Sequence, residues 1–227
     1  MKEQIKSILP KRAFNALNAQ RKQLKAFKNL ASGYGQYKGL MKGTCLNANG
    51  EICPWYTFPA LDYLARLDLS DCSVFEYGSG YSTLYYAERT KSVTAVEHHA
   101  GWFKKCKDEV LPESVNLIHA EEGKYVETLA AQKQRFDVIV IDAIKRPECA
   151  KAVKNQIESF GAKLVIFDNA DWFEDEAQNL ADTLGWVRVP MRGFGPLNDY
   201  AWQTDFLINP KEPLTLMKPQ RKPVGQK

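Results

Sequence analysis

The chain has 227 residues, a mass of 25.8 kDa and a formal net charge of +4, with 44% hydrophobic and 26% charged residues. These proportions are typical of a globular protein and exclude collagen-like, low-complexity and wholly disordered chains. No apolar stretch approaches the roughly 20 residues that cross a bilayer, and the first residues lack the apolar core of a secretion signal. The five cysteines form no Cys-x-x-Cys pair, so we expect reduced thiols. We therefore expect a soluble, cytoplasmic protein with one large domain.

Charge is distributed unevenly along the chain. Residues 1–43 hold ten Lys or Arg and one acid, and residues 211–227 hold five and one. Residues 44–210 hold sixteen Lys or Arg against twenty-five acids. The chain is therefore expected to consist of a basic helical arm (1–43), an acidic globular domain (44–210) and a basic flexible tail (211–227).

In the arm, hydrophobic residues recur at mostly helical spacing between the cations, and Pro10 breaks or starts a helix. Two interpretations stay open. The helix can pack its apolar side on the domain, which is the commoner role of an amphipathic helix. It can instead contact a membrane surface or an acidic partner, which would make the protein membrane-peripheral; nucleic acid is a less favoured partner. The hydrophobic residues are Ile5, Ile8, Leu9, Leu17, Leu24, Phe27 and Leu30.

Between Gly33 and Gly50, glycines and turn residues predict a linker or a lid hinge. Beyond it, short apolar runs alternate with helix-like stretches, which requires a mostly parallel sheet covered on both faces. The last two runs have no helix between them and predict an antiparallel hairpin. The expected fold class is therefore α/β, a Rossmann-like doubly wound seven-stranded sheet. The predicted strands are 72–77, 92–97, 115–120, 136–143, 163–169, 187–190 and 204–208, and the predicted helices are 81–89, 100–110, 122–132, 147–160 and about 172–184.

The first predicted strand ends in the sequence EYGSGYST, residues 76–83. In a doubly wound sheet, ligands bind beyond the carboxyl ends of the strands, near the point where strand order reverses. Gly78 and Gly80 allow a tight turn and a close approach of backbone to ligand. The second strand ends in Glu97, nineteen residues after Gly78. That spacing suits a carboxylate that accepts hydrogen bonds from both hydroxyls of a ribose.

This turn lacks the features of a diphosphate site. Thr83 stands where a dinucleotide-binding loop has its third glycine, and no Gly-Lys-Ser/Thr tripeptide follows as in a P-loop. Glu76 precedes the glycines, and its carboxylate would repel a pyrophosphate but can accept a hydrogen bond from an α-ammonium group. Adenosine that carries an amino acid fits this arrangement.

The E-x-G-x-G segment followed by Ser-Thr, the acid that ends the next strand and the Ile-Asp-Ala that ends the fourth strand resemble the class I S-adenosylmethionine-dependent methyltransferases. The resemblance spans about residues 55–208. Segments such as PWYTFPA, VFEYGSGYSTLYYA and LVIFDNADW more narrowly resemble a bacterial group found with polysaccharide genes, which is distantly similar to the plant glucuronoxylan methyltransferases. The resemblance implies a methyltransferase that uses S-adenosylmethionine and acts on a carbohydrate or other hydroxylated acceptor.

The resemblance also implies a set of cofactor-binding residues on the first two strands. Gly78 and Gly80 would line the methionine and ribose portion, Glu76 would lie under the ammonium group, and Glu97 would hold the ribose diol. Ser79, Ser82 and Thr83 complete the set on the turn and the start of the helix.

On the adenine side, the resemblance implies that His98 flanks the ring and that Glu121 or Glu122 lies near its exocyclic amine. His98 and His99 point in opposite directions on any extended segment, so at most one should face the cofactor. The alternative for the two glutamates is a first-turn position in the predicted helix 122–132, where an acid is favourable with the helix dipole.

Asp142 ends the fourth predicted strand, and Asp168 with Asn169 ends the fifth. Adjacent strands lie about 4.8 Å apart, so these oxygens can converge on Mg²⁺ or Mn²⁺, an arrangement that resembles the metal set of catechol-type O-methyltransferases. A metal-free site is the second interpretation, with Asp142 as the base or acceptor-orienting group and Arg146 or Lys145 steering an anionic acceptor. In the third, residues 168–171 simply cap the next helix.

Four aromatic residues are expected in exposed loops, where they can stack on a sugar face or close a lid, with core packing as the alternative for each tryptophan. They are Trp55, Tyr56, Tyr200 and Trp202. Two other functions stay open for the whole chain. The basic arm can bind RNA for a nucleic-acid methyltransferase, or the fold can serve as a catalytically silent assembly module.

Overall fold

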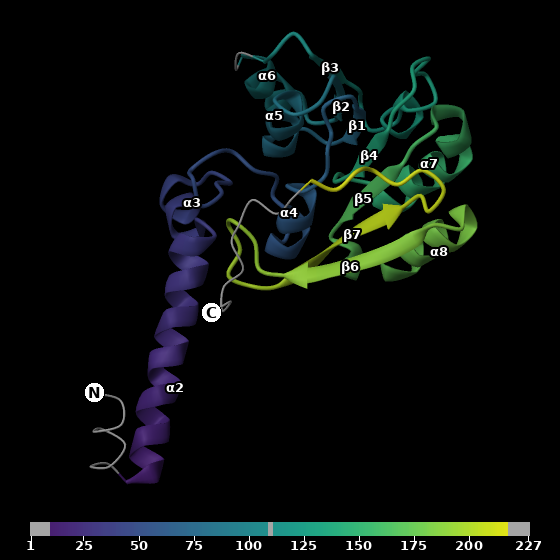
Figure 1. The fold of residues 1–227 in the computed structure, drawn as a ribbon. Helices are drawn as coiled ribbons and strands as arrows, with labels where there is room; N and C mark the ends of the chain where they lie inside the picture. Colours follow the sequence, from purple (N-terminus) through teal and green to yellow (C-terminus); the bar gives the residue numbers. More distant parts are fainter. Residues whose placement is uncertain (1–9, 109–110, 218–227) are drawn as a thin grey trace.

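A computed structural model describes residues 10–108 and 111–217. Its centre is a seven-stranded sheet with the spatial order β3-β2-β1-β4-β5-β7-β6 (Figure 1). β7 runs antiparallel to β5 and β6, and the other neighbouring pairs are parallel. The predicted α/β class, a mostly parallel doubly wound sheet with a terminal antiparallel hairpin, is confirmed. The strands are β1 (Ser73–Tyr77), β2 (Ser92–Glu97), β3 (Val115–His119), β4 (Val138–Ile141), β5 (Leu164–Asp168), β6 (Val187–Gly193) and β7 (Trp202–Ile208).

Helices cover both faces of this sheet (Figure 1). On one face Phe75 of β1 packs in a core with α7 and α8 residues that include Val153. On the other face Val74 packs with Leu64 of α4 and Tyr86 of α5. The strands are buried from both sides, which explains their nearly continuous apolar sequences. The helices are α2 (Lys11–Lys28), α3 (Gln36–Lys42), α4 (Phe58–Leu64), α5 (Tyr81–Ala87), α6 (Ala100–Asp108), α7 (Arg146–Phe160) and α8 (Glu174–Leu184), with the helical turns η1 (Asn29–Gly33), η2 (Val126–Thr128) and η3 (Ala170–Trp172).

The helix predicted over 122–132 does not form, and this prediction was wrong. The segment instead makes successive tight turns, with the single 3₁₀ turn η2 between them. Tyr125 and Leu129 are both fully buried and lie four residues apart. Two anchoring side chains at helical spacing therefore produced the periodic signal without a continuous helix.

α2 has no buried residue and projects away from the sheet (Figure 1). The interpretation in which the arm helix packs on the domain is therefore wrong for α2. α3 does pack: the Gln36 amide donates hydrogen bonds of 2.9 Å to the carbonyl oxygens of Gly195 and Asn198. Ile5, Ile8 and Leu9, which belong to the predicted arm, lie outside the described residues. Within 10–108 and 111–217, no helix has both the length and the apolar character that crossing a bilayer needs.

Part of the predicted basic tail is described, and it pairs with the segment after α4. Leu216 forms an antiparallel bridge with Leu67, and Asp68 N donates to Thr215 O at 2.9 Å. Residues 211–217 are thus attached to the domain as far as the structure describes them, and residues 218–227 lie outside it.

Candidate functional site

The strand order reverses at β1, which pairs with β2 on one side and with β4 on the other. The carboxyl ends of four adjacent strands carry acids there: Glu76 on β1, Glu97 on β2, Asp142 directly after β4 and Asp168 on β5. We call these four residues the carboxylate edge. Glu76, Glu97 and Asp168 are at most 5% exposed, whereas the side chain of Asp142 is 26% exposed. The structure therefore brings together, at the switch point, acids that are far apart in the sequence.

The glycine turn after β1 is held by hydrogen bonds to the sheet and to α5. Gly78 has a φ of +109°, and its N–H donates to Val96 O at 2.9 Å. Thr83 Oγ1 accepts from Gly80 N at 3.0 Å and donates to Glu76 Oε2 at 2.6 Å. Thr83 therefore links the acid of β1 to the turn and to the first turn of α5, where Ser82 is also buried.

Glu97 lies at the centre of a second set of hydrogen bonds. It accepts from Ser79 Oγ at 3.0 Å and from His99 N at 2.8 Å, and His98 Nδ1 lies 3.1 Å from its Oε1. The imidazole of His99 turns away and accepts from Trp102 N at 3.0 Å, at the start of α6. Of the two histidines, His98 is thus the one whose ring contacts the Glu97 carboxylate.

Trp102 is a residue of this site that the sequence did not single out. Its indole Nε1 donates to Ser79 O at 2.8 Å, and its ring carbon Cζ2 would lie 3.9 Å from a β-carbon placed on Gly80. With Cys106 it lines a cavity of about 40 Å³ behind the turn. No motif marks a tryptophan in the first turn of a helix, so only the fold reveals this contact.

On the predicted adenine side, Glu121 and Glu122 are both exposed. Glu122 Oε1 lies 3.1 Å from Lys145 Nζ, while Glu121 lines a cavity of about 530 Å³ together with His119 and Lys124. The alternative role as first-turn helix acids was wrong, because the helix predicted over 122–132 does not form.

Arg146 is hydrogen bonded around the ends of β4 and β5. Its Nη2 donates to Asp142 Oδ1 and to Asn169 Oδ1, both at 2.8 Å. Its Nε donates to Asp168 O at 3.0 Å, and its Nη1 donates to Ala143 O at 2.6 Å. Four of the five guanidinium N–H groups therefore have protein partners, so Arg146 fixes these two strand ends relative to each other.

The predicted metal ligands Asp142, Asp168 and Asn169 lie together, but their oxygens face protein donors. Arg146 donates to Asp142 and Asn169, and Asp168 Oδ1 accepts from Trp202 Nε1 at 3.1 Å and from Thr204 Oγ1 at 2.5 Å. In the part of the chain that the structure describes, no group of three or more His, Cys, Asp or Glu residues is placed to hold a metal ion. The Asn169 amide oxygen and the Oδ1 atom of each aspartate are thus hydrogen bonded to protein groups, and the metal set stays a prediction.

The capping interpretation of residues 168–171 was also wrong. Asn169 precedes η3 with a φ of +55°, and its side chain makes no capping hydrogen bond to η3. Its amide oxygen accepts from Arg146 instead. Asp171 is in an ion pair with Arg192 at 3.2 Å, so neither side chain serves the start of the following helix.

Burial raises the pKa values of Glu76, Asp142 and Asp168. Burial raises the pKa of Glu76 to about 8, against the hydrogen bonds from Ser82 and Thr83 that lower it. Burial and the charge of Asp142 raise the pKa of Asp168 well above its usual value. Burial raises the pKa of Asp142, and the charge and hydrogen bond of Arg146 act to lower it. The edge therefore favours a ligand that brings positive charge.

The aromatic residues expected in loops divide into two pairs. Trp55 and Tyr200 are 46% and 52% exposed, whereas Tyr56 and Trp202 are buried. The exposed-loop prediction was therefore wrong for Tyr56 and Trp202, and the core-packing alternative is confirmed for Trp202. The loop at Gly195 packs directly on both residues: a β-carbon on Gly195 would overlap the ring of Trp202 and the carbonyl oxygen of Tyr56. Trp202 thereby reaches Asp168 from inside the core.

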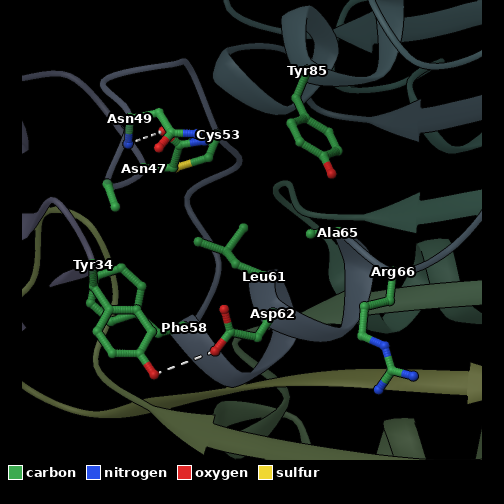
Figure 2. Close-up of a pocket in the computed structure, with 11 residues that line it drawn as sticks. Tyr34, Asn47, Asn49, Cys53, Phe58, Leu61, Asp62, Ala65, Arg66 and Tyr85 are labelled. Atoms are coloured by element: carbon green, nitrogen blue, oxygen red, sulfur yellow. Dashed lines mark hydrogen bonds between the residues drawn. The ribbon is translucent and has the colours of Figure 1, made fainter. Parts of the chain in front are cut away.

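A separate cavity of about 370 Å³ lies beside α4, and no predicted site residue lines it (Figure 2). Tyr34 and Phe58 form one wall, with their ring centroids 4.6 Å apart. The Tyr34 hydroxyl donates to Asp62 Oδ2 at 3.3 Å, and Arg66 lies on the other side of Asp62 (Figure 2). The end of the arm and the first helix of the domain thus share this cavity.

No family model and no curated protein matches the chain. Among solved structures, it is similar to the N-methyltransferase NodS from Bradyrhizobium japonicum WM9, with 13% identity over 66% of this chain and 91% of that chain, and a TM-score of 0.48. It is also similar to a methyltransferase-like protein from Silicibacter pomeroyi, with 20% identity over 68% and 84% of the two chains and a TM-score of 0.47. A third similar structure is magnesium protoporphyrin IX methyltransferase from Synechocystis PCC 6803 with bound SAM. It has 11% identity over 62% of this chain and 71% of that chain, and a TM-score of 0.47. These are partial likenesses of fold.

Proposed function

We propose that the chain is an S-adenosylmethionine-dependent methyltransferase that methylates a hydroxyl group of a carbohydrate or other hydroxylated acceptor. The observation that carries the proposal is the carboxylate edge beside the glycine turn. Of its four carboxyl groups, that of Asp142 accepts a hydrogen bond from the Arg146 guanidinium, which reaches Asp168 only at its backbone carbonyl oxygen. A ligand with an ammonium group, a sulfonium and a ribose diol complements this charge, whereas a dinucleotide would bring two phosphates against it.

The residues present fit such a cofactor. Glu97 sits at the end of β2 and is hydrogen bonded to the turn through Ser79, next to the backbone along which a ribose diol would lie. Gly80 leaves its β-carbon position open, with its nearest neighbour at 3.9 Å, so a ligand can approach the backbone. The pKa of Glu76 is raised to about 8, so a nearby cation would stabilise this residue in its ionised form.

Bound S-adenosylmethionine would supply a methyl group that an acceptor oxygen displaces from sulfur. The protein must then align the acceptor oxygen and remove its proton. Asp142 is suited to accept this proton, because its side chain is part-exposed at the edge and its pKa is raised. Arg146 is a positioning residue in this scheme. Its donors already hold Asp142 and Asn169, so it is poorly placed to steer an anionic acceptor.

Calorimetry with S-adenosylhomocysteine tests the cofactor assignment. We expect binding in the micromolar range, and no competition by nicotinamide dinucleotide. Absence of any binding heat would contradict the proposal and favour the alternative that the chain is a catalytically silent assembly module. A screen of labelled methyl transfer onto glycans, small-molecule extracts and RNA, with and without chelator, then identifies the acceptor. Methyl transfer to RNA alone would contradict the proposal that the acceptor is a glycan or a hydroxylated small molecule.

A further inference from the structure

α2 exposes apolar side chains along its length. None of its eighteen residues is buried, and Leu17, Leu24 and Phe27 are 52%, 69% and 66% exposed. Figure 1 shows the helix projecting from the body, to which η1 and α3 join it. Large apolar side chains that line up on an exposed helix mark an interaction surface, because their removal from water is favourable.

These side chains form one stripe rather than a scatter. At 100° per residue, Leu17, Leu24 and Phe27 fall within about 80° of the helix circumference. Ala13 lies in the same arc, and Gln20 is the polar residue that interrupts it. The helix is about 27 Å long, so the stripe is suited to lying along a surface.

Cations border this stripe. α2 carries six Lys or Arg and no acid, and Arg21, Lys25 and Lys28 lie within about 80° of Leu17 on the side away from Phe27. Long basic side chains can lie along an apolar surface with their methylene groups and extend their charged ends to neighbouring anions. The combination of an apolar stripe and a basic flank is typical of a helix at a membrane interface.

α3 also exposes apolar and basic side chains. Tyr37, Leu40 and Met41 are 61%, 51% and 71% exposed, and Lys38 and Lys42 lie between or beside them. Residues 11–42 contain eight Lys or Arg and no Asp or Glu. We call the exposed side of residues 11–42 the arm surface.

We propose that the arm surface docks on an anionic lipid bilayer, with α2 lying in the plane of the interface. This inference does not depend on methyl transfer. Charge complementarity supports it, because each Lys or Arg near an anionic surface is favourable and no acid in the segment opposes it. A second copy of the arm is a poorer partner, since pairing two such helices would bring like charges together. The acidic domain, residues 44–210, would be held away from the same surface, consistent with the helix standing off the body.

Sedimentation of the full-length protein with lipid vesicles tests the proposal. We expect binding to phosphatidylcholine vesicles that contain about one-third phosphatidylglycerol, and at least about a hundredfold weaker binding to phosphatidylcholine alone. Binding should fall as salt rises, because the anionic attraction is screened. Equal binding to both vesicles, or binding to neither, would overturn the proposal.

Two variants separate the apolar and basic contributions. Leu24→Gln with Phe27→Gln should weaken binding to the anionic vesicles at least about tenfold, since both side chains leave the lipid. Arg21→Gln, Lys25→Gln and Lys28→Gln together should weaken it about a hundredfold. The matched control is Ala19→Gln with Ala26→Gln, on the opposite side of α2, which should bind like the unchanged protein. Circular dichroism of each variant checks that the helix is retained.

Three further outcomes would contradict the bilayer as partner. Vesicle binding that survives Leu24→Gln with Phe27→Gln would mean that the apolar stripe is not used. A dimer seen by light scattering without lipid, and lost in that same variant, would assign the stripe to a second copy. Tighter binding to RNA than to anionic vesicles would assign the cations to nucleic acid.

Discussion

The carbonyl oxygen of Asp142 lies so close to Gly78 that a β-carbon on Gly78 would overlap it. The turn after β1 and the turn after β4 are therefore in direct contact at the switch point of the sheet. A ligand on the glycine turn would lie next to the acid proposed to accept the acceptor's proton. In the proposed function, this contact would place the cofactor directly beside the acceptor, with no element between them.

Gly78→Ala should destabilise the fold by about 2–3 kcal/mol, because the residue has a φ of +109° and its side chain would overlap backbone. Chemical denaturation measures this. Gly185→Ala is the matched control, since Gly185 has a φ of +63° but open space around its β-carbon, and about 1 kcal/mol is expected there. Equal losses at both positions would mean that contact with Asp142 is unimportant.

Gly80→Val should leave stability within about 1 kcal/mol and weaken S-adenosylhomocysteine binding at least about a hundredfold, because the branch fills space left open for the ligand. Calorimetry and denaturation are both needed. Gly80→Ala should give an intermediate affinity. Micromolar affinity retained by Gly80→Val would place the ligand elsewhere.

Glu97→Gln should weaken cofactor binding about tenfold to a hundredfold, the usual effect of losing a charged hydrogen-bond acceptor. Titration calorimetry measures it. Glu88→Gln provides the control, since Glu88 is exposed on α5's end and pairs with Arg89. If both variants bind equally well, Glu97 only orders the turn through Ser79 and His99.

Asp142→Asn should lower turnover about a hundredfold or more while cofactor affinity changes little, because the variant keeps the shape but loses the proton acceptor. Initial rates with an identified acceptor measure this, with Asp175→Asn as a surface control on α8. Turnover that rises again at higher pH in Asp142→Asn would support the proton role. An unchanged rate would move the chemistry to another residue.

Glu76 gives the apo protein a pH-dependent stability. Its pKa in the folded chain is raised to about 8 from a usual 4.5, so the folded state holds a proton that the unfolded state has lost. The free energy of unfolding should therefore fall as pH rises between about 5 and 8, by at most about 1.4 kcal/mol per pH unit from this group. Denaturation across this pH range should show a flatter profile in Glu76→Gln. An identical slope would assign the effect to Asp142 or Asp168, whose pKa values are also raised.

Much of the fold can be predicted from the sequence, because a strand buried on both faces has an apolar run in its own residues. β4 and β5 are apolar at nearly every position, and the absence of a helix between the last two runs indicated the β6–β7 hairpin correctly. The positions of Glu76, Glu97 and Asp142 at strand ends followed from the same pattern. Their shared location then follows from parallel strands, whose carboxyl ends meet at one edge.

The partners of these acids required the tertiary structure. Asp168 is held by Trp202 and Thr204, more than thirty residues away on β7, and only the antiparallel pairing of β5 with β7 brings them together. Arg146 was predicted to steer an anionic acceptor in the metal-free interpretation, but four of its five guanidinium N–H groups donate to protein oxygens around two strand ends. Hydrogen bonds between distant side chains depend on packing geometry that periodicity does not record.

In the arm, too, the sequence predicts the helix but not its contacts. Helical periodicity and charge in residues 11–28 predict an amphipathic basic helix, and the helix forms. Whether its apolar stripe is buried depends on where the rest of the chain lies, and the structure leaves Leu17, Leu24 and Phe27 exposed. The sequence by itself determined the elements, their order and the acids at their ends. Only the tertiary structure decided which polar groups are paired and which apolar groups stay in water, because both depend on contacts between segments far apart in the chain.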